Sequence, residues 1–245
     1  AEVKAEKKTE KPKKAPKPKA PVELKDYGFV AVCMGKGITN ILKDLGVDRV
    51  IEGGQTMNPS TDDILKAVKR VKAKTVYVFP NNKNIIMAAN QAAELVEDKK
   101  IVVIPSKSVP QCISAMVEFN DKKSAEANEK AMNKAIGRVT SGQLTYAVRD
   151  TEIDGIEIKK DDILGMVEGK IVTVGKDIDD VLNRVVSQMV DEDTEFLNVY
   201  YGKEIKKPQA DVMLKALETK YADDEIEVSF KKGGQPLYYY IISAE

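Results

Sequence analysis

The sequence predicts an α/β protein: a parallel-sheet subdomain of β–α units, followed by a mixed-sheet α/β subdomain. Three observations support this fold class. Short apolar runs alternate with helical periods four times in the first half of the chain. Those runs are nearly continuous, as is typical of parallel strands that are covered on both faces. After Phe119 the pattern changes, and alternating segments indicate a mixed sheet with helices on one side.

The first half is expected to contain four strands and four helices in alternation. The strands are predicted at residues 28–34, 49–52, 75–79 and 100–104. The helices are predicted at residues 38–45, 61–72, 84–97 and 109–118. The second of these helices places Ile64, Leu65, Val68 and Val71 on one face of a 3.6-residue period, which predicts that this face is buried.

The second half is expected to begin with a longer helix at residues 124–138. A strand follows at residues 140–150, with Leu144, Tyr146 and Val148 on one face. Asp154 and Gly155 indicate a turn, and Gly169 indicates another. The remaining strands are predicted at 170–174, 196–201, 225–230 and 237–242, and the remaining helices at 177–190 and 209–221.

The predicted domain organisation has three parts. Residues 1–25 form a disordered linker, residues 26–119 the parallel α/β subdomain and residues 120–245 the mixed-sheet α/β subdomain. Residues 11–21 consist of Lys, Pro and Ala alone, a composition that buries too little apolar area to offset its ordering entropy. Such a linker suggests a further domain before it. A polybasic membrane anchor is the alternative for this segment.

Composition excludes several classes of chemistry. The chain of 245 residues has no His, which removes the commonest metal ligand and the commonest general base near neutral pH. Cys33 and Cys112 lie in apolar segments, which predicts two buried free thiols and a cytoplasmic protein. No apolar run approaches the roughly 20 residues of a membrane span.

Charge is unevenly distributed along the chain. Residues 1–21 hold eight Lys and three Glu, a net charge of +5, while the whole chain has a net charge of zero. The rest of the chain therefore carries −5. We expect no nucleic-acid partner, because the basic charge belongs to the linker and not to the folded part.

A polar loop follows each strand of the first half. Loops at the carboxyl ends of parallel strands share one sheet edge, where ligands bind and where helix N-termini favour anions. The candidate partner- or ligand-binding residues are Gly53, Gly54, Gln55, Thr56, Asn58, Asn81, Asn82, Ser106 and Lys107. Each loop also has a purely structural explanation. Ser60 and Asp63 have the spacing of a capping box, and Asn81 and Asn82 can begin the next helix.

Nucleotide and nucleophile motifs are weak or missing. The segment Gly35–Asn40 follows a strand and opens a helix, but Asn40 stands where a dinucleotide fingerprint has its third Gly or Ala. Neither a Walker A pattern nor a Gly-x-Ser-x-Gly elbow occurs. The acidic pairs at 62–63, 161–162 and 223–224 sit at predicted helix starts or turns, where capping explains them.

The run Gly53–Thr61 (GGQTMNPST) resembles the C-terminal region of bacterial fatty acid kinase catalytic subunits. These are dihydroxyacetone kinase-like, DegV-associated proteins of the YloV type. Three further stretches agree with the family, at residues 80–85, 104–111 and 233–238. The resemblance covers residues 26–245, and it implies the subdomains of DegV and dihydroxyacetone kinase proteins.

The resemblance also implies a function. In this family a kinase phosphorylates a fatty acid held by a separate DegV-like fatty-acid-binding protein, and the module seen here would help to dock that partner. ATP and magnesium are expected in an N-terminal kinase domain of the same protein, and no cofactor in this chain. The Asp-rich motif of that domain is absent here, so no catalytic or metal residue is carried over and the module is expected not to be an enzyme. A homodimer is possible.

Two other hypotheses stay open. The first is a DegV-like domain that binds a lipid or small ligand itself. The second is a nucleotide-dependent enzyme built on the Gly35–Asn40 loop. If the strand-end loops only cap helices, docking would have to use the second subdomain, around Tyr200, Tyr201 and Tyr238 to Tyr240.

Overall fold

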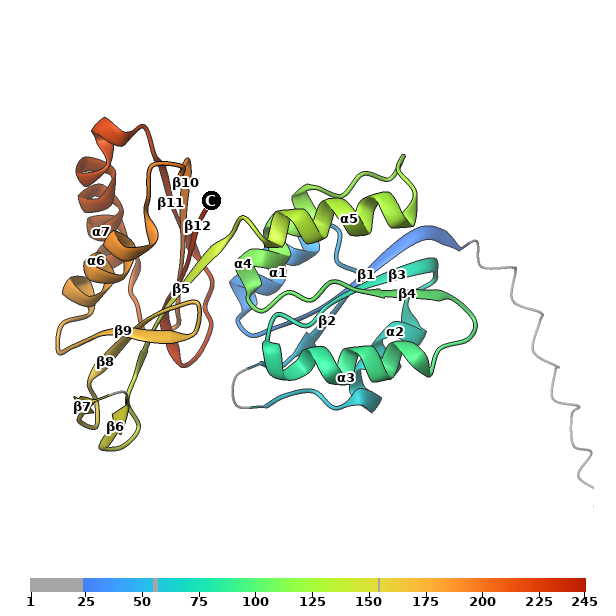
Figure 1. Cartoon of the computed structure of the whole chain (residues 1–245), viewed down its shortest axis with the longest axis horizontal. Helices are drawn as coiled ribbons and strands as arrows, with labels where there is room; N and C mark the ends of the chain where they lie inside the picture. The colour runs from blue at the N-terminus through green and yellow to red at the C-terminus, as the bar shows by residue number, and fades with distance from the viewer. Residues whose placement is uncertain (1–23, 55–56, 154) are drawn as a thin grey trace, which may run out of the picture.

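A computed structural model describes residues 24–54, 57–153 and 155–245. It consists of two lobes, a first lobe of residues 24–138 and a second lobe of residues 139–245 (Figure 1). Most of the predicted linker lies outside the described residues, as do Gln55, Thr56 and Asp154.

The first lobe is built on a four-stranded parallel sheet with the order β2-β1-β3-β4. Its strands are β1 (Lys25–Cys33), β2 (Arg49–Glu52), β3 (Ala73–Phe79) and β4 (Lys100–Val103). Its helices are α1 (Lys36–Asp44), α2 (Thr61–Arg70), α3 (Lys83–Glu94), α4 (Val109–Val117) and α5 (Ala125–Ile136). The predicted succession of β–α units is therefore confirmed.

The continuous apolar strands are explained by helices on both faces of the sheet. In β1, Val30 and Val32 pack with α2 and α3, whereas Phe29 and Ala31 pack with α1 and α4. Successive residues of a strand point to opposite faces, so a strand buried on both sides needs an apolar residue at nearly every position.

Helix α5 follows the predicted subdomain boundary at residue 119 but packs with the first lobe. Met132 of α5 shares a core cluster with Phe29 and Met116, and Tyr77 Oη donates to the carbonyl oxygen of Ala125 at 2.9 Å. An amphipathic helix must bury its apolar face against another element, and α4 supplies that surface. The chain therefore enters the second sheet only after α5.

The second lobe is a six-stranded mixed sheet with the order β11-β10-β12-β5-β8-β9. Its strands are β5 (Thr140–Tyr146), β8 (Ile163–Val167), β9 (Lys170–Gly175), β10 (Phe196–Tyr201), β11 (Glu227–Lys232) and β12 (Tyr238–Ala244). A separate hairpin is formed by β6 (Thr151–Ile153) and β7 (Ile156–Ile158). Helices α6 (Ile178–Met189) and α7 (Lys207–Lys220) cover the face that is turned away from the first lobe (Figure 1).

Three strands of this lobe are not predicted by the sequence. β6 and β7 have only three residues each, and β8 is interrupted by Gly165. Gly165 is needed there because a Cβ would overlap side-chain atoms of Val185 on α6 and Thr173 on β9. The strand predicted at 140–150 ends at Tyr146, and Val148 is 72% exposed.

One buried apolar cluster contains residues of both lobes. Tyr200 of β10 and Ile241 of β12 belong to the same buried cluster as Ile38 of α1 and Cys112 of α4. Tyr201 and Tyr240 are also buried, against α6 and α7. The tyrosines that the sequence offers as an alternative docking surface are thus mostly used inside the fold.

Candidate functional site

The strand-end edge of the first sheet carries a buried hydrogen-bond network around Asn81. Its Nδ2 donates to the carbonyl oxygen of Val32 at 2.9 Å, at the end of β1. Ser106 Oγ donates to Asn81 Oδ1 at 2.7 Å and accepts from the backbone N–H of Asn81 at 3.2 Å. Asn81 and Ser106 are both buried, so their polar groups hold the ends of β1, β3 and β4 together.

Three other polar residues of this edge begin helices. Asn82 Oδ1 accepts from the backbone N–H of Asn84 and caps α3. Ser60 and Asp63 form a reciprocal capping box at the start of α2, as the sequence predicts. Ser108 Oγ accepts from the backbone N–H of Gln111 and caps α4. The helices α2, α3 and α4 are therefore each capped by the side chain of the residue that precedes the helix.

The remaining candidate residues differ in their exposure. Asn58 and Lys107 are exposed, whereas Gly53 is buried and Gly54 is half-buried. Gly54 has φ 147°, and its N–H donates to the carbonyl oxygen of Met57 at 3.1 Å. Among the predicted residues that the structure describes, Asn58 and Lys107 are the exposed side chains that can meet a partner.

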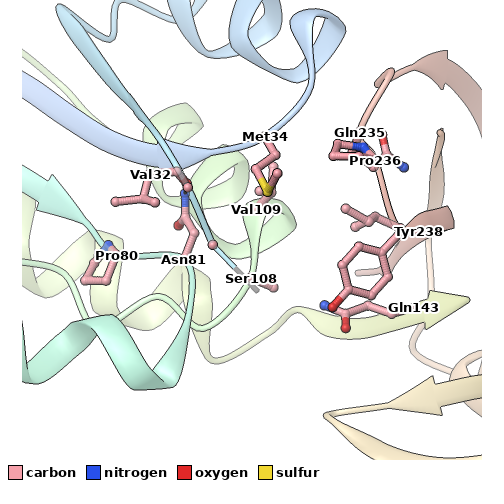
Figure 2. Close-up of a pocket in the computed structure, with 13 residues that line it drawn as sticks. Val32, Met34, Pro80, Asn81, Ser108, Val109, Gln143, Gln235, Pro236 and Tyr238 are labelled. Carbon is pink, nitrogen blue, oxygen red and sulfur yellow. The ribbon is translucent and has the colours of Figure 1, made fainter. Parts of the chain in front are cut away.

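A small cavity lies between the strand-end edge and the second sheet. It has a volume of about 50 Å³. Figure 2 shows the two walls: Val32, Met34, Asn81 and Ser108 from the first lobe, and Gln143, Gln235, Pro236 and Tyr238 from the second. Pockets for small molecules usually have about 300–1,000 Å³, so this cavity has room for water but not for an acyl chain.

Gln235 is the most constrained polar residue of the cavity wall. It is 2% exposed, and its Nε2 donates to the carbonyl oxygen of Tyr200 at 2.7 Å. Its Oε1 has no hydrogen-bond partner among the described residues. The sequence contains the run Gly233–Tyr238 as a family feature but gives no role to Gln235, because its cavity neighbours lie far away along the chain.

The Gly35–Asn40 segment serves to pack the two lobes together. The backbone N–H of Ile38, in the first turn of α1, donates to the carbonyl oxygen of Gly233 at 3.1 Å. A Cβ at Gly35 would lie 2.6 Å from the backbone nitrogen of Gln235, and a Cβ at Gly37 would overlap the carbonyl of Lys232. Close approach of two backbones thus explains these glycines, which otherwise resemble a dinucleotide motif.

Burial shifts the ionisation of several groups near the lobe interface. It raises the pKa of both thiols, Cys33 and Cys112, and it raises the pKa of Tyr238 to about 12. Both cysteines are free and buried, as predicted. In the part of the chain that the structure describes, no three or more His, Cys, Asp or Glu side chains gather in a group that could hold a metal ion.

The sequence and the fold both match known proteins. The family model for the FakA-like C-terminal region of fatty acid kinases matches residues 28–245. The chain belongs to this family. The resemblance carried by the Gly53–Thr61 run is thereby confirmed.

Relatives of this fatty acid kinase family module are longer than the module itself. Protein YloV of Bacillus subtilis (strain 168) is 49% identical over 225 residues, which are 92% of this chain and 40% of that protein. An uncharacterized protein of Staphylococcus aureus (strain USA300) is 44% identical over 229 residues, 94% of this chain and 41% of that protein. The chain spans about two fifths of the length of the curated relatives it matches.

Solved structures share the fold of the module at low sequence identity. DegV, a fatty acid binding protein from Bacillus subtilis, has a TM-score of 0.63 at 12% identity, covering 90% of this chain and 99% of that chain. The dihydroxyacetone kinase of C. freundii has a TM-score of 0.61 at 11% identity, and the match covers 89% of this chain and 48% of that chain. The Streptococcus pneumoniae fatty acid kinase (Fak) B3 protein loaded with linoleic acid has a TM-score of 0.53 at 10% identity. The match covers 90% of this chain and 99% of that chain. These likenesses confirm the predicted fold class.

None of the helices in the described ranges combines the length and the apolar character that a bilayer crossing needs.

Proposed function

We propose that this chain is a non-catalytic C-terminal module of a cytoplasmic fatty acid kinase and that it docks a DegV-like fatty-acid-binding protein. Membership of the FakA-like C-terminal family supports the first part. ATP, magnesium and the phosphoryl transfer would belong to a kinase domain in the remainder of the longer protein. That domain would be a second partner of this module.

The observation that carries this proposal is the small volume of the cavity between the strand-end edge and the second sheet. Solved proteins with this fold include DegV, named as a fatty acid binding protein, and a Fak B3 protein loaded with linoleic acid. Here Tyr238, Met34 and Gln235 leave only about 50 Å³ in the cavity between the strand-end edge and the second sheet. A module that keeps the fold without room for the lipid is better suited to bind the protein that carries the lipid.

Exposed polar groups at the strand-end edge are the proposed contact with that protein. Asn58 and Lys107 lie on loops that follow β2 and β4, and both side chains are open to solvent. Gln55 and Thr56, between Gly54 and Asn58, remain predicted contact residues. Contacts of this kind contribute to binding without supporting the core, so they can be removed at little cost to stability.

A second candidate function is a small-ligand site between the lobes. The buried Gln235 Oε1 favours it, because an acceptor without a partner is costly and a ligand donor or a water would satisfy it. Native mass spectrometry of the purified chain separates the two functions. A copurified ligand adds a discrete mass, and the docking proposal expects none.

Titration calorimetry with fatty-acid-loaded Bacillus subtilis DegV tests the docking proposal, since a relative of 49% identity occurs in the same organism. Saturable binding is expected. The double variant Asn58→Ala, Lys107→Ala should weaken it while the melting temperature stays unchanged. Lys130→Ala with Lys134→Ala is the matched control and should bind as the wild type does, because these two exposed residues of α5 line neither the interlobe cavity nor the surface beside β2. A folded wild-type chain that binds no DegV would refute the proposal.

A further inference from the structure

Strand β2 leaves one edge of the first sheet open. In the order β2-β1-β3-β4 it pairs with β1, and no other described strand lies beside it. The N–H of Gly53 donates to the carbonyl oxygen of Cys33 at 3.2 Å, so the backbone of residue 53 points toward β1. Backbone groups of successive strand residues point to opposite sides. The N–H and C=O groups of Val50 and Glu52 therefore point outward, away from the sheet.

A hollow flanks this open edge on each face of the sheet. On the α2 side there is a hollow of about 480 Å³, and Ile51, Pro59 and Ala67 are among the residues that line it. On the α1 side a hollow of about 600 Å³ lies between Val50 and Pro236. Side chains of a strand alternate between faces, so a strand added to β2 would place successive side chains in the two hollows.

The two hollows carry an excess of positive charge. Their cationic side chains are Lys36, Lys43, Arg49, Lys66, Arg70 and Lys203, of which Lys66 is paired with Asp62. Three carboxylates line the same surface, but Asp48 is bonded to Lys25 and Asp63 closes the capping box with Ser60. Glu52 is then left to face the cations, so a segment that enters here is favoured if it is acidic.

We propose that an extended, acidic segment of a partner protein adds to the outer edge of β2 as a fifth strand. The inference rests on the proposed function in that it takes the DegV-like protein as the partner. Main-chain hydrogen bonds to Val50 and Glu52 would fix the register, and acidic side chains would meet the cations on both faces.

Two other occupants fit this edge less well. Residues 1–21 of the chain itself hold eight Lys and three Glu and carry the same sign of charge as the hollows. A second copy pairing through its own β2 would bring Arg49, Lys43 and Lys203 against the same cations of the first copy. Like charges placed opposite each other oppose association.

The substitution Glu52→Pro tests strand addition, and Glu52→Ala is its matched control. Glu52 is exposed and its N–H points outward, so proline removes one outward donor and no hydrogen bond to β1. We expect Glu52→Pro to weaken the Kd for fatty-acid-loaded Bacillus subtilis DegV by about tenfold or more. Glu52→Ala removes the same carboxylate but keeps the N–H, and it should bind as tightly as the wild type or more tightly.

Two further measurements keep the test decisive if Glu52→Pro folds poorly. Lys36→Glu with Lys203→Glu should weaken binding at low salt, and the difference should shrink at high salt as the charges are screened. Amide exchange should slow at Val50 and Glu52 when DegV is added to the wild type. The Lys130→Glu, Lys134→Glu control on α5 should bind as tightly as the wild type, and its Val50 and Glu52 amides should still be protected when DegV is added.

The outcomes separate this inference from the docking proposal. Wild-type binding that is unaffected by Glu52→Pro, without protection of the two amides, overturns strand addition and leaves docking intact. No binding by the wild type overturns both. If the wild-type chain dimerises and Glu52→Pro abolishes the dimer, the edge binds a second copy of the chain, and the inference is overturned. If deletion of residues 1–21 speeds amide exchange at Val50 and Glu52, the edge binds the chain's own N-terminal segment, and the inference is likewise overturned.

Discussion

The hydroxyl groups of Ser108 and Ser141 lie 2.7 Å apart and join the two lobes by a buried hydrogen bond. Ser108 stands at the start of α4 in the first lobe, and Ser141 lies in β5 of the second. The bond fixes the second sheet against the strand-end edge beside the interlobe cavity. Thirty-three residues separate the pair along the chain.

Ser108→Ala should destabilise the protein more than Ser141→Ala. Ser108 also caps α4, and a lost cap costs about 0.5–2 kcal/mol. The bond between the hydroxyls should appear as a coupling energy of about 0.5–1.5 kcal/mol. A double-mutant cycle measured by urea unfolding gives this coupling directly. Additive effects of the two substitutions would show that the hydroxyls do not interact in solution.

Ser106→Ala should destabilise the protein by about 1–3 kcal/mol, because Asn81 loses a partner for both its N–H and its Oδ1 inside the fold. Its neighbour Lys107 is exposed, so Lys107→Ala should leave the unfolding free energy unchanged within about 0.5 kcal/mol. Urea denaturation of the two variants provides the comparison. Equal stabilities would mean that water replaces the serine hydroxyl.

Gly37→Ala should loosen the contact between the lobes. The new Cβ would overlap the carbonyl of Lys232, and relief of such overpacking typically costs about 1–3 kcal/mol. Gly137→Ala is the control, since Gly137 has φ −76° and the nearest atom to a new Cβ is 3.4 Å away. Thermal unfolding should show a lowered melting temperature for Gly37→Ala alone. A fully stable Gly37→Ala variant would contradict the close packing of α1 against the Gly233 loop.

Asp162 should make stability depend on pH in acid. Hydrogen bonding to Lys176 and to the backbone N–H of Lys159 lowers the pKa of its carboxyl below the ordinary value of 3.8. Its contribution is therefore present above pH 3.8 and is lost as the pH falls through the lower pKa of the folded state. The stability difference between wild type and Asp162→Asn should be constant near neutral pH and shrink in acid.

A matched variant gives the baseline for that pH series. Asp161 is the exposed neighbour of Asp162, and Asp161→Asn should follow the wild type across the same pH range. Denaturation midpoints between about pH 7 and pH 2 are the measurement, chosen because carboxylates titrate within that interval. A difference between wild type and Asp162→Asn that grows in acid would reverse the assigned direction of the shift.

Both thiols should be unreactive in the folded protein. Burial raises the pKa of Cys33 and Cys112, and the thiolate is the reactive form. Ellman's reagent at about pH 8 should label neither cysteine in the native chain and both after unfolding in guanidinium chloride. Rapid labelling of the native chain would reveal an opening of the core around β1 and α4.

The residue pattern by itself determines most elements of this protein and the two kinds of sheet, but not strands β6, β7 and β8. Val30 and Val32 alternate with Phe29 and Ala31. This apolar run predicts a strand covered on both faces, whichever helices provide the cover. Ser60 with Asp63 specifies the start of α2 because a capping box needs only a local spacing. Strand β2 is predicted with the bounds that the structure has.

Contacts between distant residues were decided only by the tertiary structure. From the sequence, Asn81 and Ser106 could bind a ligand or stabilise the fold. The hydrogen bond between them, across 25 positions, shows that they stabilise the fold. Gly37 resembles a residue of a dinucleotide-binding loop, but in the structure it packs against the backbone of Lys232. The structural role of Gln235 is seen only in its hydrogen bond to the carbonyl oxygen of Tyr200. Helix and strand patterns come from forces between near neighbours, which a sequence contains. Whether a polar group faces solvent or a partner within the fold depends on which segments pack together, and that is a property of the whole chain.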